Sequence, residues 1–374
     1  STMASSTESK KKLVCYVTNY AQQRKGDGKF MPSDVDPNLC THIILAFAKV
    51  EKNKLTPSNP ADSEHGGIYE KVNQLKKSNP KLKTLLAVGG GSKERIRNII
   101  EMSSSPSSRQ EFIKSVTKTL NSFGFDGLDM DWEHPSNSKE KHNYTLLMQE
   151  LRKTFDKKNT RFLLSAAVPA GFETINTGYD VPALSRSVDF LNLMTYDFHG
   201  PWDKHTGHNT PLYSSPNDTP YSKKLTVSNA ASTWVHKGAP KDKIMIGMAT
   251  YGRTFTLANP ASSGVGAMAV SGGRPGLYTR KSGCLAYYEI CQMLKNGAHY
   301  EWDKNTFVPY AVKGDQWIGY DNESSIRKKT AWLRENGYGG AMVWTMDFDD
   351  FKGNFSDTNF PLIKTIKSEL RIDM

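Results

Sequence analysis

The stretch 125–135 reads Phe-Asp-Gly-Leu-Asp-Met-Asp-Trp-Glu-His-Pro and decides how the rest of the chain is interpreted. Side chains alternate between the two faces of a β-strand. In a strand here, three carboxylates share one face and three apolar side chains the other: Asp129, Asp131 and Glu133 against Leu128, Met130 and Trp132. A row of carboxylates makes a poor solvent-exposed face, because Asp has low strand propensity and like charges repel. We therefore predict that helices cover the apolar face and that the carboxylates point into an enclosed site.

Enclosure has a chemical consequence for these carboxylates. Burial and mutual repulsion raise at least one carboxyl pKa, and a carboxyl that stays protonated near neutral pH suits a general acid. Other interpretations stay open: a solvated acidic strand, a Mg²⁺ or Ca²⁺ site, or a nucleic-acid enzyme. The row lacks the glycine and the spacing of an EF-hand loop, and nothing in it would cradle a phosphate.

Composition narrows the classes of protein further. A hydrophobic content of 37% is ample for a large core, and the formal net charge of +11 favours anionic surfaces as partners. No basic stripe alternates with aromatic residues, so nucleic acid is not an expected partner, and no apolar run approaches the ~18 residues of a membrane span. The first residues, Ser-Thr-Met-Ala-Ser-Ser, look like a cloning remnant, and we expect residues 1–12 to form a disordered tail.

Apolar runs alternate with helical patterns along the chain. Strands are predicted at 13–19, 41–50, 83–90, from Phe125, and at 162–169, 189–197, 243–252 and 340–346. Apolar residues at helical spacing lie between most of them, at 68–77, 112–120, 144–155, 230–237, 326–335 and 362–370. Eight strands alternating with helices predict an α/β fold, a (β/α)8 TIM barrel with a parallel sheet.

One connection is far longer than the barrel needs. About 70 residues, rich in glycine and aromatic residues, lie between Gly252 at the end of one strand and the helix near Ile326. A few residues would be enough to connect that strand to that helix. We predict a folded α+β insertion domain at 252–322, with the barrel formed by 13–251 and 323–374. A domain that packs on the barrel without touching a ligand stays an alternative.

Active sites of such barrels form at the C-terminal ends of the strands. Glu133 ends strand four, with Asp131 and then Asp129 deeper. Other strand ends and their neighbours supply further candidates: Tyr16, Phe47, Gly90, Met194, Tyr196, Asp197, Trp202, Tyr251, Arg253 and Trp344. Carboxylates beside aromatic rings suit a sugar, because pyranose rings stack on aromatic faces while hydroxyls bind polar groups. Several of these aromatic residues are equally compatible with plain core positions.

At this row the chain resembles the family 18 glycoside hydrolases of the animal chitinase type. The family signature Asp-Gly-x-Asp-x-Asp-x-Glu is matched at Asp126, Gly127, Asp129, Asp131 and Glu133, and the resemblance extends from about residue 13 to 370. It implies a barrel whose insertion domain forms one wall of a substrate cleft. It also implies substrate-assisted catalysis, an exception to the usual pair of carboxylates on opposite sides of the scissile bond.

The resemblance further implies roles for the acidic row. Glu133 protonates the leaving oxygen, and the 2-acetamido carbonyl of the sugar attacks the anomeric carbon to give an oxazolinium ion. Asp131 stabilises that cation, Asp129 shares a proton with Asp131, and Tyr196 orients the acetamido oxygen. The substrate must then carry N-acetyl groups, and no metal and no cofactor is required.

Substrate-binding roles follow from the same resemblance. Asp197 and Arg253 bind sugar hydroxyls, and Trp344 forms the floor under the reacting ring. A disulfide between Cys15 and Cys40 is also implied; from the residues alone, these cysteines lie on strand one and at the start of strand two.

The chain departs from the family pattern at the cleft. A tryptophan that commonly follows strand three is Gly91, the tryptophan common after strand one is Tyr20, and His134 stands where many relatives have tyrosine. We predict that the cleft has no aromatic platform at position 91 on which the leaving-group sugars could stack, because glycine has no side chain. The alternative is that Gly91 is required in a turn with positive φ.

These observations predict a secreted, extracellular, monomeric chitinase that hydrolyses chitin or β-1,4-linked N-acetylglucosamine oligosaccharides. A chitinase-like lectin is one alternative, but such relatives usually lose the glutamate that Glu133 supplies here. An endo-β-N-acetylglucosaminidase acting on N-glycans is the other, although those enzymes generally keep less of the insertion.

Overall fold

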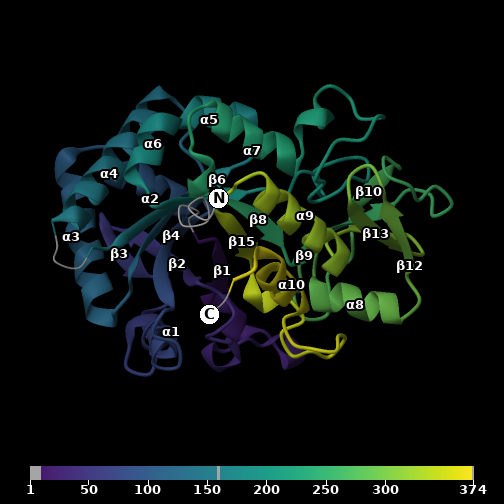
Figure 1. Ribbon diagram of the computed structural model, residues 1–374, viewed down its shortest axis with the longest axis horizontal. Helices are drawn as coiled ribbons and strands as arrows, with labels where there is room; N and C mark the ends of the chain where they lie inside the picture. Colours follow the sequence, from purple (N-terminus) through teal and green to yellow (C-terminus); the bar gives the residue numbers. More distant parts are fainter. Residues whose placement is uncertain (1–9, 158–160, 373–374) are drawn as a thin grey trace, which may run out of the picture.

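The computed structural model describes residues 10–157 and 161–372. Parallel strands form a closed eight-stranded barrel in which β1 pairs with both β2 and β15 (Figure 1). Its strands are β1 Lys12–Thr18, β2 His42–Glu51, β4 Lys83–Gly90, β5 Gly127–Trp132, β6 Leu163–Pro169, β7 Phe190–Met194, β8 Ile244–Ala249 and β15 Gly340–Trp344. The predicted (β/α)8 barrel is confirmed. Residues 1–9 of the expected tail lie outside the described residues, and Lys12 already belongs to β1.

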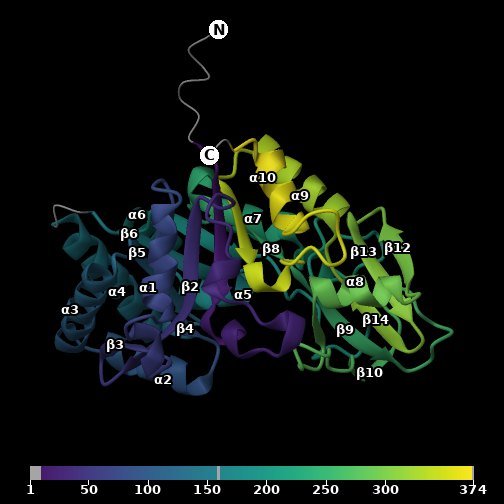
Figure 2. The same ribbon diagram turned by 90° about the horizontal axis from the view of Figure 1, so that it is seen from below.

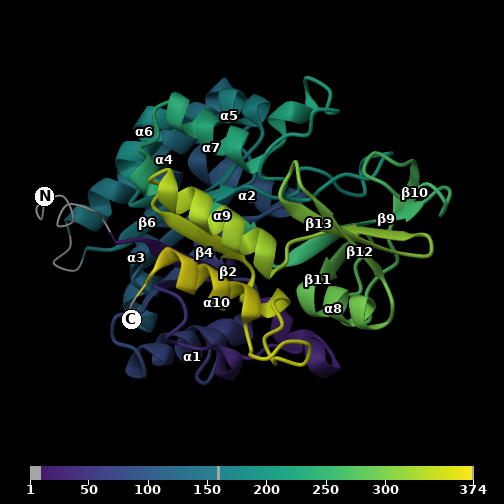
Figure 3. The same ribbon diagram turned by 45° about the vertical axis from the view of Figure 1, so that its right-hand side comes forward.

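Helices surround the barrel on its outside (Figure 1). They are α1 Ile68–Gln74, α2 Lys93–Ser103, α3 Pro106–Phe123, α4 Ser138–Asp156, α5 Phe172–Gly178, α6 Val181–Ser187, α7 Val227–His236, α9 Glu323–Glu335 and α10 Pro361–Leu370. Figure 3 shows α9 and α10 side by side beside β15. The apolar spacing predicts neither the short strand β3 (Lys54–Pro57) nor α2, whose sequence is mostly polar.

The two faces of a barrel strand have different surroundings: one packs against the helices and the other points into the barrel. On β5, the apolar side chains Leu128, Met130 and Trp132 lie in the large core between the barrel and its helices. The alternate residues Asp129 and Asp131 are buried on the opposite face. The predicted alternation along this strand is therefore confirmed, and it turns the carboxylates into the barrel.

A second sheet occupies the long connection after β8. Its order is β10-β9-β14-β13-β12 with β11 paired to β9, and all of its pairings are antiparallel. The strands are β9 Tyr251–Leu257, β10 Ala269–Gly272, β11 Cys284–Ala286, β12 His299–Asp303, β13 Val308–Lys313 and β14 Gln316–Gly319, with α8 at Tyr287–Lys295. Figure 2 shows this unit beside the barrel. It begins at Tyr251, one residue before the expected boundary.

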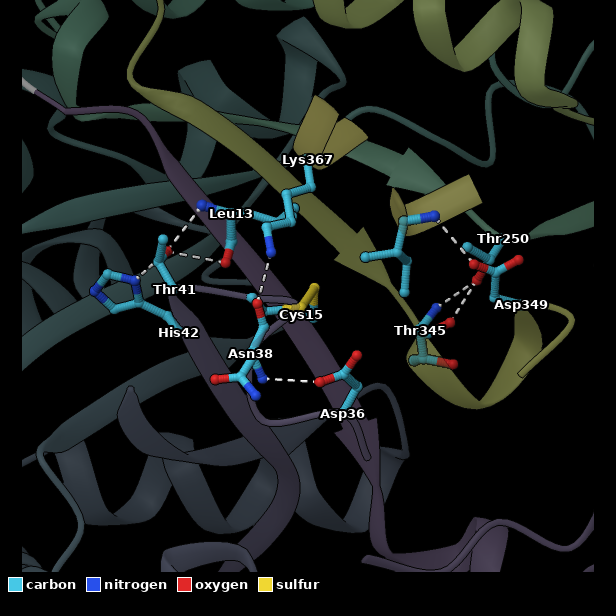
Figure 4. Close-up of a disulfide and its surroundings, with 12 residues drawn as sticks. Leu13, Cys15, Asp36, Asn38, Thr41, His42, Thr250, Thr345, Asp349 and Lys367 are labelled. Carbon is cyan, nitrogen blue, oxygen red and sulfur yellow. Dashed lines mark hydrogen bonds between the residues drawn. A yellow bond between two sulfur atoms is a disulfide. The ribbon is translucent and has the colours of Figure 1, made fainter. Parts of the chain in front are cut away.

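The disulfide between Cys15 and Cys40 ties β1 to the segment that leads into β2. Thr41 adds to this connection, because its backbone N–H donates to the carbonyl of Leu13 at 3.0 Å and its hydroxyl accepts from the N–H of Leu13 at 2.9 Å (Figure 4). The disulfide implied by the family resemblance is confirmed. Among the described residues, no helix is both long and apolar enough to cross a bilayer.

Candidate active site

A cavity of about 670 Å³ opens at the C-terminal ends of the barrel strands, between the barrel and the insertion. Most of the predicted site residues line it: Tyr16, Phe47, Asp131, Glu133, Met194, Tyr196, Asp197, Tyr251, Arg253 and Trp344. Asp129, Gly90 and Trp202 lie outside its lining. The barrel topology thus brings together residues from strands that are more than 300 positions apart in the sequence, as Tyr16 and Trp344 are.

Asp129 lies deepest in the row and is fully buried. Its Oδ2 accepts a hydrogen bond from Tyr16 at 2.6 Å, and its Oδ1 accepts from Ser165 at 2.7 Å and from Asn192 at 3.2 Å. Burial raises the pKa of Asp129, while these three donors oppose the rise. Both carboxylate oxygens are therefore already engaged by side chains from three other strands.

Asp131 and Glu133 follow Asp129 in the acidic row, nearer to the end of the strand. Burial raises the pKa of Asp131 well above its usual value, and the charge and hydrogen bond of Glu133 raise it further. The pKa of Glu133 is raised as well, first by burial, then by the charge of Asp197, against a lowering hydrogen bond from Asp131. The charge of Asp129 also raises the pKa of Asp131, so the three carboxyl groups of the row affect one another.

An ionic cluster faces this pair from the other side of the cavity. Oδ1 of Asp197 accepts hydrogen bonds from the Tyr251 hydroxyl at 2.6 Å and from Nε of Arg253 at 2.9 Å. The backbone N–H of Asp197, whose φ is 60°, donates to Oδ1 of Asn209 at 2.7 Å. The Asp197 carboxylate is thereby fixed in direction by partners from the first strand of the insertion.

Three aromatic rings in contact line the cavity, those of Trp344, Tyr16 and Phe47, and we call them the aromatic floor. The Trp344 ring lies 5.1 Å from the Tyr16 ring and 5.8 Å from the Phe47 ring. Tyr196 stands beside Tyr251, and its pKa is raised by burial and then by the neighbouring carboxylates, so its phenol keeps its proton. This floor offers an apolar face of the kind on which a sugar ring stacks.

The residues outside the lining still adjoin it. Trp202 is 57% exposed and its ring lies 5.1 Å from the guanidinium carbon of Arg253. Gly90 has a φ of 106°, and a side chain there would approach the Phe47 ring. Gly91 lines the cavity, has no positive φ, and would place a Cβ in open space. The alternative interpretation of Gly91 as a positive-φ turn residue is therefore wrong; Gly89 and Gly90 hold those positions instead.

Sequence reasoning misses two groups of residues. Ser165 and Asn192 bind Asp129, and each is a polar residue inside an otherwise apolar strand, a signal that the sequence does contain. The second group lies on loops and very short elements with no periodic pattern: Gln23, Arg24, Lys25, Tyr278, Thr279, Arg280, Lys281, Cys284 and Phe348. Within residues 10–157 and 161–372, no three His, Cys, Asp or Glu side chains are grouped so as to hold a metal ion.

A barrel that holds a buried pair of acids with raised pKa values beside aromatic rings has the architecture of a glycoside-binding or glycoside-cleaving protein. The chain belongs to the glycosyl hydrolases family 18, whose family model matches residues 12–349.

The relatives include proteins named as a chitotriosidase and as a chitinase-like protein. The chain is 44% identical to chitotriosidase-1 of Mus musculus, with 96% of this chain and 78% of the relative covered. It is also 44% identical to chitinase-3-like protein 2 of Homo sapiens, with 96% of this chain and 92% of the relative covered.

Solved structures give the same division. An immunomodulatory active chitinase from Trichuris suis superposes with a TM-score of 0.93 at 40% identity, covering 96% of this chain and all of the other. Human YKL-39, described as a pseudo-chitinase with retained chitooligosaccharide binding, superposes with a TM-score of 0.92 at 42% identity, covering 97% of this chain and all of the other. Family membership alone therefore does not separate cleavage from binding.

Proposed function

We propose that this protein is a chitinase that hydrolyses β-1,4-linked N-acetylglucosamine polymers and oligosaccharides with substrate assistance and retention. The observation that carries the proposal is the Asp131–Glu133 pair beside the Trp344 floor. The raised pKa values favour the protonated form of the pair, and a general acid must carry a proton in order to donate it. Glu133, the less buried of the two, donates this proton to the leaving oxygen.

The other side chains of the cavity fit the remaining steps. Oδ1 of Asp131 is buried and has no hydrogen-bonding partner among the described residues, so it is available to the acetamido N–H. The Tyr196 phenol keeps its proton and donates to the acetamido oxygen, which attacks the anomeric carbon. Water then opens the oxazolinium ion, with Glu133 as the base. Asp129, deepest in the row, raises the pKa of Asp131 through its charge and shares a proton with it.

The decisive experiment compares Glu133→Gln with Glu173→Gln. Glutamine in place of Glu133 keeps the volume of the side chain but cannot donate the proton, so turnover of chitotriose should fall by at least the ~10²–10⁴-fold typical of general acids, with oligosaccharide binding retained. Glu173 is an exposed residue of α5, and its variant should match the parent. Near-normal turnover by the Glu133 variant would refute the assignment. A parent protein that binds chitotriose without cleaving it would be a lectin.

Stereochemistry and substrate choice test the rest of the proposal. Two successive inversions give net retention, so proton NMR should detect the β anomer first, and an initial α anomer would exclude substrate assistance. Assays of labelled chitotriose against an N-glycoprotein separate a chitinase from an endo-β-N-acetylglucosaminidase. We further propose a secreted monomer, since a disulfide persists in oxidising compartments; sedimentation analysis checks the oligomeric state.

A further inference from the structure

The cavity carries a group of cations that the proposed reaction does not use. Lys25 follows the short helix η2 (Asn19–Gln23), and Arg280 and Lys281 lie on the loop between β10 and β11. All three residues are exposed and line the same cavity as Glu133. None of the three forms an ion pair with a carboxylate of the described residues. We call Lys25, Arg280 and Lys281 the cationic rim.

The two loops that carry the cationic rim lie against each other. A Cβ added to Gly28 would lie 2.7 Å from Cβ of Tyr278, and a Cβ added to Gly26 would lie 3.2 Å from Cε1 of the same ring. The barrel loop with Lys25 and the insertion loop with Arg280 and Lys281 therefore meet at one end of the cavity. Their charges face one volume rather than separate parts of the surface.

Buried groups hold both loops in place. On the insertion side, the Glu289 carboxylate accepts hydrogen bonds from the N–H groups of Tyr278 at 3.0 Å and Thr279 at 3.3 Å, and from the Thr279 hydroxyl at 2.6 Å. On the barrel side, Nη1 of Arg24 lies 2.9 Å from Oδ2 of Asp347. The cationic rim thus stands on loops whose backbones are already ordered, which lowers the entropic cost of binding an anion.

The charge of the cavity is not balanced from within. The other two cations of the lining are paired, Arg24 with Asp347 and Arg253 with Asp197. The carboxylates left over in the lining are Asp131 and Glu133. Three unpaired cations against at most two negative charges leave this end of the cavity positive, so it attracts anions.

We propose that the cationic rim selects N-acetylglucosamine glycans that carry an anionic substituent, a sulfate or a carboxylate, on a sugar next to those at Glu133. This inference rests on the proposed function for the location of the glycan, and it names the substrate class within it. A neutral chitin chain needs no such charges, whereas an anionic substituent gains charge-assisted hydrogen bonds from them.

The test measures binding of chitotetraose and of 6-O-sulfated chitotetraose by calorimetry in the Glu133→Gln protein, which prevents turnover. We expect the sulfated glycan to bind roughly fivefold more tightly at about 0.01 M salt and about equally at about 1 M salt. The preference should disappear when Lys25→Gln, Arg280→Asn and Lys281→Gln are combined. Asparagine is chosen at Arg280 because its φ is 56°, a conformation that asparagine tolerates.

Lys29→Gln is the matched control, because Lys29 is exposed on the same loop but does not line the cavity. It should keep the preference. Equal affinity for both glycans at low salt, a preference that survives in the combined variant, or an equal loss in the control would each overturn the inference. Hydrolysis of neutral chitotetraose by the parent protein is measured separately. Its failure would overturn the proposed function while leaving a measured anion preference intact.

Discussion

Gly91→Trp tests whether the cleft lacks a stacking platform. The position accepts a side chain, because Gly91 has no positive φ and a Cβ added there would meet no atom within 4 Å. It also lines the cavity that contains Glu133 and Trp344. One aromatic stack is worth about 1 kcal/mol, which corresponds to roughly a fivefold change in a binding constant. We therefore expect KM for long chitin oligosaccharides to fall about fivefold, with a smaller change for short ones.

The assay is steady-state hydrolysis of an oligosaccharide series, combined with thermal unfolding of each variant. Gly91→Ala and Gly90→Ala are the matched controls. Gly90 has a φ of 106°, so alanine there should cost about 1–2 kcal/mol of folding free energy, whereas alanine at position 91 should cost almost nothing. A stable Gly91→Trp protein with unchanged KM for every length would refute the platform. Destabilisation by Gly91→Ala would contradict the conclusion that its backbone is unstrained.

Further expectations concern the disulfide, the pH dependence and the acid row. Cys15→Ala with Cys40→Ala opens a loop of 25 residues and should lower the free energy of unfolding by about 3 kcal/mol in urea titrations; a loss below about 1 kcal/mol would contradict the loop-closure argument. Asp197→Asn removes a charge that raises the pKa of Glu133. The alkaline limb of the kcat/KM profile, where Glu133 loses its proton, should therefore move to lower pH. An alkaline limb at the same pH in the variant would show that the charge of Asp197 does not act on Glu133. Tyr16→Phe removes the 2.6 Å hydrogen bond to Asp129 and should lower the free energy of unfolding by about 1.5–3 kcal/mol in the same titrations. An unchanged free energy of unfolding would show that this hydrogen bond does not stabilise the fold.

The sequence predicts the parts of this protein that follow from periodicity. Alternation along β5 is a local property, so the direction of Asp129, Asp131 and Glu133 follows from their spacing once the strand is recognised. The closed barrel follows from the alternation of strands and helices, because a parallel barrel brings the C-terminal ends of all its strands to one face. Residues at those ends, such as Trp344, could therefore be assigned to the cavity without knowing any distance.

Other features depend on contacts that no local pattern encodes. Tyr16, Ser165 and Asn192 donate hydrogen bonds to both oxygens of Asp129. That outcome depends on which side chains three other strands turn inward at the same depth. Gly91 is a similar case: two neighbouring glycines made positive φ a reasonable expectation, but only the backbone itself shows that the strain is confined to the residues before it.

The loops explain how one barrel can keep its chemistry while its substrate range changes. Asp131 and Glu133 are held by a strand that is buried on both faces, where a substitution disturbs packing and the pKa values together. Arg280 and Lys281 are exposed, and the backbone of their loop is held by Glu289 rather than by their own side chains. Exchanging such residues alters the charge of the cavity without disturbing the barrel core, so the proposed selectivity for anionic glycans can change independently of the acidic pair.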